Sequence, residues 1–76
     1  MDVEIFQEKL MDIDSAFTYH APKEGQTARY VEIRDTAKQF AKLIERNCPP
    51  SSERTLALRK LQECVMWANA SIAINE

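Results

Sequence analysis

Aromatic and basic side chains of the types that bind nucleotides stand close together in the sequence. Tyr19 and His20 lie in a segment without helical periodicity, and Phe17 precedes them. Arg34 and Lys38 follow on a helical pattern, one turn apart. An aromatic face stacks on a nucleobase with about 1–3 kcal/mol, and Arg or Lys neutralises phosphate. These residues are therefore suited to a ligand that carries both a planar ring and negative charge.

Thr36 adds a hydroxyl group near Arg34. A purely structural interpretation of the same residues is equally simple. Phe17 would anchor an N-terminal arm to the rest of the chain, Tyr19 would follow it, and the basic residues at 34, 38, 42 and 46 would form a solvated helix face. The residues alone leave both interpretations open.

Catalytic and metal-binding patterns are not found. His20 is the only histidine, and no Ser or Cys stands in a recognisable nucleophile turn. Cys48 and Cys64 lie too far apart for a zinc spacing, and no glycine-rich phosphate loop occurs. We therefore expect no enzyme, no metal and no cofactor. The two cysteines have no pairing pattern, which favours free thiols in a reducing compartment.

The charge is unevenly distributed along the 76 residues. The net charge is −2, yet residues 1–22 carry five acids and one base, and residues 23–60 carry nine bases and five acids. A weakly acidic chain with a basic middle suits a local anionic ligand better than a long nucleic-acid track. Packing of the acidic arm against the basic middle would explain the distribution equally well. The acidic start does not resemble a signal peptide, and no apolar run is long enough to span a membrane.

The elements that must position these residues are helices. With 45% hydrophobic residues and a single Gly, the chain is expected to be all-α, as one domain over 1–76. Long helices are predicted over 27–47, capped by Thr27, and over 51–74, capped by Ser51 or Ser52. The short connection through Pro49 and Pro50 makes them an antiparallel hairpin. An N-terminal arm over 1–16 is predicted to contain a short amphipathic helix, and 23–26 to form a turn around Gly25.

Apolar residues predict which faces of the hairpin are buried. One stripe comprises Tyr30, Ile33, Ala37, Phe40, Ala41 and Ile44; the other comprises Leu58, Leu61, Val65, Ala68 and Ile72, widened by Ala57, Cys64 and Ala73. Met66 and Trp67 lie off the second stripe, so the last helix is apolar on nearly all sides. A helix of that kind should be covered on all sides. A chain this short needs other copies of itself for this cover, and we expect a homo-oligomer.

Four motifs resemble those of a known family. They are Phe17-Thr-Tyr-His-Ala-Pro22, Arg29-Tyr30-x-x-Ile33-Arg34, Cys48-Pro49-x-Ser51-x-Glu53-Arg54 and Met66-Trp67-Ala68-Asn69-Ala70-x-Ile72-Ala73. Together they span residues 17–74. They resemble the phage anti-CBASS sponges, which bind cyclic oligonucleotides, and their anti-Thoeris relatives, which share a hairpin domain. The last of the four motifs is the most specific.

The resemblance implies a helical protomer in a hexamer that sequesters cyclic nucleotides without cleaving them, in the cytoplasm of the infected bacterial host. For the pocket that binds cyclic dinucleotides it implies a stacking aromatic together with a basic residue and a hydroxyl group. Here those roles fall to Tyr19, His20, Arg34, Thr36 and Lys38. A guanidinium at Arg34 could hold two phosphate oxygens at once.

For cyclic trinucleotides the resemblance implies a second site on a three-fold axis, formed by Ser51 and Arg54 beside a helix N-terminus. The sequence departs from the family in two respects. Pro50 removes a hydroxyl group that relatives offer, and 76 residues leave no room for the sheet-bearing segment of the anti-Thoeris branch.

Three functions follow as hypotheses. The first is a stoichiometric sponge for cyclic nucleotides that blocks CBASS signalling. The second is a small helical adaptor or inhibitor that covers a partner protein with Met66, Trp67 and the apolar last helix. The third is a weak nucleic-acid binder that uses the basic helix face.

Overall fold

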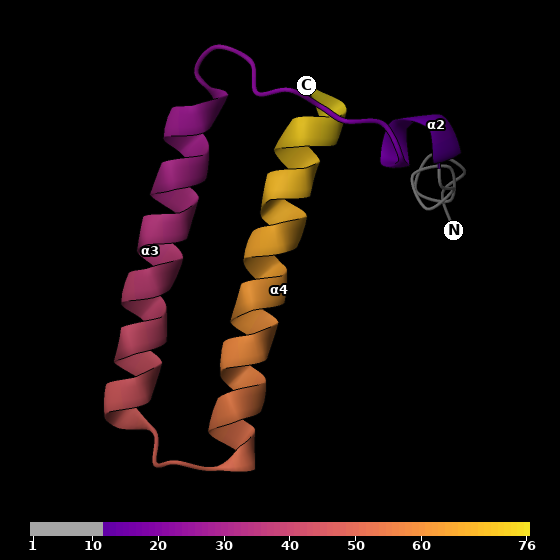
Figure 1. Cartoon of the computed structure of the whole chain (residues 1–76). Helices are drawn as coiled ribbons and strands as arrows, with labels where there is room; N and C mark the ends of the chain where they lie inside the picture. The colour runs from indigo at the N-terminus through magenta and orange to yellow at the C-terminus, as the bar shows by residue number, and fades with distance from the viewer. Residues whose placement is uncertain (1–11) are drawn as a thin grey trace, which may run out of the picture.

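The computed structural model describes residues 12–76, and all secondary structure within that range is helical. Helix α2 spans Ile13–Ala16, α3 spans Gln26–Asn47 and α4 spans Ser52–Asn75. Figure 1 shows α3 and α4 side by side as a hairpin, with the segment between α2 and α3 passing the C-terminal end of α4. The expected all-α class is confirmed for these residues. The amphipathic helix expected in the arm 1–16 falls mainly on residues 1–11, outside the described part.

The hairpin turns at residues 48–51, as the prolines predict. Cys48 is extended (φ −114°, ψ 133°), because a residue before proline avoids the helical region. Its N–H still donates to the Ile44 carbonyl at 2.9 Å and completes the last turn of α3. The Ser51 Oγ atom accepts from the Arg54 N–H at 3.0 Å. This bond confirms Ser51 as the N-cap of α4.

Helix α3 begins one residue earlier than expected, at Gln26, and the cap is different. Gly25 occupies the N-cap position with φ 82°, a left-handed conformation that glycine adopts without strain. The Gln26 N–H donates to the Lys23 carbonyl at 3.0 Å, and the Gln26 Oε1 atom accepts from the Lys23 N–H at 2.9 Å. The predicted turn over 23–26 therefore forms, but Thr27 does not cap the helix.

The apolar stripes of α3 and α4 face each other, yet they remain only half-buried. Among residues 12–76 no apolar side chain is fully buried, and Gln26 is the only buried residue. Phe40 is 51% exposed, and Ala57 and Cys64 are exposed as well, so their predicted burial is wrong for the single chain. Two helices can cover only the faces they turn toward each other, and these three side chains lie beyond that seam.

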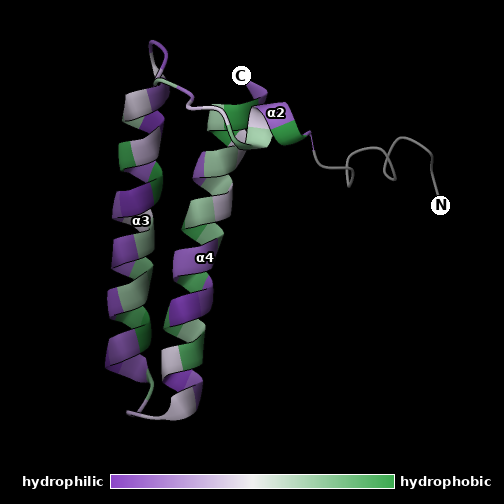
Figure 2. Cartoon of the chain, turned by 45° about the vertical axis from the view of Figure 1, so that its right-hand side comes forward, coloured by the Kyte–Doolittle hydropathy of each residue, from purple (hydrophilic) through white to green (hydrophobic). Residues whose placement is uncertain are grey.

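Large apolar side chains remain on the outside of the hairpin. Phe17 is 82% exposed, Met66 64% and Trp67 69%. Figure 2 shows hydrophobic residues along the length of both helices, especially in the C-terminal half of α4. Within the described residues, neither long helix is apolar enough over a sufficient length to cross a membrane.

Candidate functional site

A hollow of about 350 Å³ is lined by residues near the start of α3 and the end of α4. These two helix ends form the open end of the hairpin (Figure 1). Three elements line the hollow: the segment before α3, the first half of α3 and the last turns of α4. The lining residues are Tyr19, His20, Pro22, Tyr30, Arg34, Asn69, Ala70 and Ala73. Two aromatic rings, an imidazole and a guanidinium thus share one concave surface. These groups can stack on a planar ring and neutralise an anion.

Hydrogen bonds to α2 position the segment that carries Tyr19 and His20. Asp12 caps α2 by accepting from the Ser15 N–H at 3.3 Å, and the Thr18 hydroxyl donates to the Asp14 carbonyl. The His20 Nε2 atom lies 2.7 Å from the Ser15 carbonyl oxygen. A carbonyl oxygen can only accept, so Nε2 carries the proton and Nδ1 is left for another partner. Tyr19, 85% exposed, is therefore presented from a backbone that is held in place.

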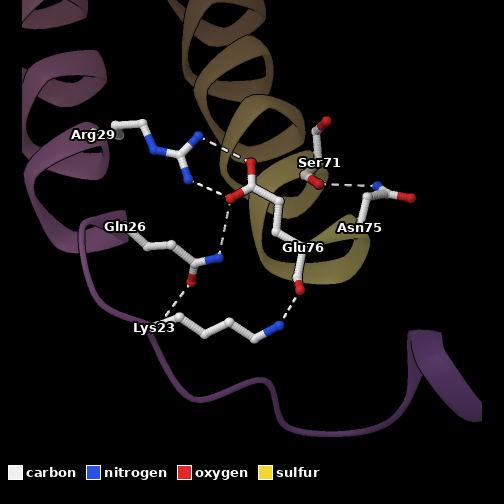
Figure 3. Close-up of polar contacts among 6 residues, drawn as sticks. All are labelled: Lys23, Gln26, Arg29, Ser71, Asn75 and Glu76. Atoms are coloured by element: carbon white, nitrogen blue, oxygen red, sulfur yellow. Dashed lines mark hydrogen bonds and ion pairs between the residues drawn. The ribbon is translucent and has the colours of Figure 1, made fainter.

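A polar cluster links the start of α3 to the end of α4 at the open end of the hairpin (Figure 3). Arg29 donates to both carboxylate oxygens of Glu76, with 2.9 Å between Nη1 and Oε2. Lys23 donates its ammonium to the Glu76 main-chain oxygen, and the Gln26 amide donates to the Glu76 carboxylate at 3.4 Å. The hydrogen bonds from Arg29 lower the pKa of Glu76, and their reciprocal effect raises the pKa of Arg29. This cluster joins the end of α4 to the start of α3 beside the hollow.

Arg34 is exposed and borders two hollows. Besides the site with Tyr19 it lines an apolar hollow of about 550 Å³, together with Lys38, Leu58 and Met66. The ion pairs within residues 12–76 are Arg29–Glu76 and Lys60–Glu63, so neither Arg34 nor Lys38 is neutralised by a described carboxylate. Both cations follow the same side of α3, one turn apart.

Thr36 lies apart from the other predicted dinucleotide residues in the single chain. Together with Ile33, Phe40 and Cys64 it lines a different hollow, of about 400 Å³. Residues two apart on a helix point to opposite sides, which separates Thr36 from Arg34. One chain therefore brings Tyr19, His20 and Arg34 together, with Lys38 at the margin, and leaves Thr36 on another face.

The predicted trinucleotide residues lie at the opposite end of the hairpin, and their polar groups are already engaged. The Ser51 hydroxyl donates to the Pro49 carbonyl at 3.1 Å while it accepts from the Arg54 N–H. The Arg54 Nη1 atom donates to the Cys48 carbonyl at 3.2 Å. A phosphate here would have to replace the bond from Ser51 to Pro49, whereas Arg54 retains further donors.

The structure adds residues that the sequence did not single out as site residues. Tyr30 and Asn69 line the hollow with Tyr19, and the Oδ1 atom of Asn69 is buried without a hydrogen-bond partner among residues 12–76. The available signal was a polar side chain within the small and apolar run from Met66 to Ala73. Elsewhere in the described range, no three His, Cys, Asp or Glu side chains gather as metal ligands.

Comparison with known proteins identifies a family. The family model described as "Acb2/Tad1, hairpin domain" matches residues 10–73. No curated protein and no solved structure matches the chain. The matched range contains the whole of α3, most of α4 and every lining residue of the hollow.

Proposed function

Because the chain belongs to the Acb2/Tad1 hairpin-domain family, a family of sponges, we propose that it sequesters cyclic oligonucleotide second messengers and so blocks CBASS signalling in the cytoplasm of the infected bacterium. The resemblance seen in the motifs is thereby confirmed at the level of the family. The ligand class is the proposal, with cyclic dinucleotides first and cyclic trinucleotides second.

The observation that carries the proposal is the convergence of Tyr19, His20 and Arg34 on one hollow. Tyr19 offers a stacking face for a base, and Arg34 offers a planar fork that can hold two phosphate oxygens. The anchored backbone at His20 reduces the conformational entropy that a mobile loop would lose on binding. Lys38 supports the same anion from one turn further along α3.

We propose that one chain forms only part of the complete pocket. A volume of about 350 Å³ lies at the low end of the roughly 300–1,000 Å³ typical of small-molecule sites. A second copy would enclose the remainder of the ligand, and Thr36 could contribute from that copy. The exposed Met66 and Trp67 and the unfilled apolar hollows of the single chain support assembly. We propose a homo-oligomer, with a hexamer as the expected state.

Cyclic trinucleotides are assigned to Ser51 and Arg54. The N-terminus of α4 attracts anions, and Arg54 lies in its first turn. Binding requires the Ser51 hydroxyl to leave Pro49 and turn to a phosphate, which a hydroxyl rotor can do. Three copies around an axis would then present three guanidinium groups.

Sequestration is proposed to occur without catalysis. The polar groups gathered at the hollow are a tyrosine pair, an imidazole, a guanidinium and a carboxamide, and no carboxylate is among them. These groups bind and orient an anion, and hydrolysis is not part of the proposal.

Calorimetry against cyclic di- and trinucleotides tests the proposal, with linear dinucleotides and a single-stranded oligonucleotide as controls. We expect tight binding of at least one cyclic ligand and its intact recovery after heat denaturation of the complex. Absence of binding to every cyclic ligand would contradict the sponge, and recovery of linear product would contradict the non-catalytic mechanism.

An alternative function is supported by the exposed side chains of α4. Met66 and Trp67 form an apolar surface that a different protein could cover, which would make the chain a helical adaptor or inhibitor. Light scattering separates this alternative from self-assembly: a monomer that remains monomeric at micromolar concentration favours the adaptor. Binding of the oligonucleotide alone would favour the third function, a weak nucleic-acid binder.

A further inference from the structure

The wall of the hollow contains a hydrogen-bond acceptor without a donor. Asn69, on α4, lines the hollow beside Ala70 and Ala73, and its Oδ1 atom is buried with no partner among residues 12–76. Asn75 lies on the same helix but is exposed to solvent, and its amide nitrogen donates to the Ser71 carbonyl at 2.9 Å (Figure 3). Among residues 12–76, the Asn69 Oδ1 atom is the only buried side-chain nitrogen or oxygen without a hydrogen-bond partner.

A buried acceptor without a donor costs free energy, because it has lost water and gained nothing in exchange. Such groups are rare in folded proteins and usually have a specific reason. An apolar residue would avoid this cost at position 69, since Ala68, Ala70 and Ala73 around it are apolar. The unsatisfied acceptor therefore indicates a donor that belongs to a bound molecule.

We propose that Asn69 reads the base of the bound nucleotide by accepting a hydrogen bond from its exocyclic amino group. This inference rests on the proposed function. The carboxamide shares the hollow with Tyr19 and Arg34, to which the proposed function assigns the base and the phosphate. The χ2 torsion of Asn has broad wells, so rotation about it can turn Oδ1 toward a base in the hollow. The preferred ligand then carries adenine, guanine or cytosine at this position, and uracil is disfavoured.

The small side chains around Asn69 fit this role. Ala70 and Ala73 leave space at the wall that larger residues would fill, so a base edge can approach α4 closely. A site built around a hydrogen bond also discriminates strongly between ligands, because a ligand without the donor leaves the buried acceptor unpaired. Asn69 is therefore assigned to ligand specificity, in addition to the affinity supplied by Tyr19 and Arg34.

The test combines a ligand change with a residue change. Affinities of wild type, Asn69→Leu and Asn75→Leu are measured by calorimetry for a cyclic dinucleotide of adenine and for its analogue with unsubstituted purine, which lacks only the amino groups. Asn75→Leu is the matched control, because it removes an asparagine from the same helix outside the hollow. Circular dichroism and light scattering confirm that each variant keeps its fold and assembly.

For wild type and Asn75→Leu we expect the analogue to bind about tenfold more weakly, which corresponds to ~1.4 kcal/mol. In Asn69→Leu the two ligands should bind within about twofold of each other, since the acceptor is gone. If the analogue binds more weakly than the adenine ligand by the same factor in Asn69→Leu and in wild type, the inference is wrong. The donor to Asn69 would then be a water molecule or a second copy of the chain. Where adenine is not the bound base, the same comparison is made with guanine and hypoxanthine. Failure of wild type to bind any cyclic ligand would instead contradict the proposed function itself.

Discussion

Arg29 in the first turn of α3 and Glu76 beyond the last turn of α4 form a two-point ion pair across the open end of the hairpin. Lys23 and Gln26 add hydrogen bonds to the same residue. The pair lies at the end of the molecule that carries the hollow, so it holds the helical walls of the hollow together there. Its strength therefore bears on both the stability of the hairpin and the shape of the site.

Replacement of Glu76 should reveal a pH-dependent contribution to stability. The pKa of Glu76 is lowered in the folded chain, chiefly by the hydrogen bonds from Arg29. A carboxyl group with a lowered pKa in the folded chain stabilises the fold at pH values above its pKa in the unfolded chain. This stabilisation is lost as the pH falls through the pKa of the folded chain. We expect Glu76→Gln to reduce the melting temperature by no more than a few degrees at pH 7, because the pair is exposed.

Thermal melts from pH 7 down to pH 3 measure this effect. The difference between wild type and Glu76→Gln should shrink toward zero at the acidic end, and added salt should reduce it at pH 7. Glu63→Gln, which breaks the surface pair with Lys60, is the matched control. A difference that stays constant across the pH range would show that the ion pair does not contribute.

Tyr19→Ala should weaken cyclic dinucleotide binding. Loss of a stacking face costs ~1–3 kcal/mol, which corresponds to a loss of up to about 100-fold. Phe17→Ala is the matched control, because Phe17 is an equally exposed aromatic residue that does not line the hollow. Calorimetry should show a large loss for the first variant and little for the second. Equal affinities of wild type and Tyr19→Ala, with assembly intact, would place the base elsewhere.

Arg54→Ala should act on cyclic trinucleotides alone. The proposed three-fold site contains three copies of this charge, and the substitution removes all three. The loss of affinity for cyclic trinucleotides should therefore exceed the loss caused by removing a single exposed charge. It keeps the Arg54 N–H and hence the cap from Ser51, whereas Ser51→Ala would also remove the cap and cost about 0.5–2 kcal/mol of stability. Arg59→Ala serves as the charge-matched control. Loss of dinucleotide binding in Arg54→Ala would contradict two separate sites.

Trp67→Glu should disrupt assembly. Trp67 is 69% exposed in the single chain, and its burial against another copy would not tolerate an unpaired carboxylate. Light scattering should give a hexamer for wild type and smaller species for the variant. Lys60→Glu, a charge change on the same helix, should leave the mass unchanged. A wild-type chain that is monomeric at micromolar concentration would contradict the interface argument.

The sequence by itself determined the helical hairpin, because its signals act locally. Pro49 and Pro50 end α3, the Ser51 hydroxyl caps α4, and Gly25 permits the turn before α3. Each of these effects depends on a few neighbouring residues and needs no distant contact. The start of α3 is a partial exception, because Gly25 and not Thr27 is the N-cap, and Gln26, the first helical residue, accepts from the Lys23 N–H.

Only the tertiary structure decided which residues share a surface. Helical periodicity places Phe40 and Cys64 near an apolar stripe, but one partner helix covers too little of that stripe to bury them. The meeting of Tyr19, Arg34 and Asn69 depends on how the segment before α3 crosses the end of α4. That crossing is held by contacts such as Lys23 to Glu76, which are distant in sequence. Such contacts leave no periodic pattern, so they emerge only when the chain is folded.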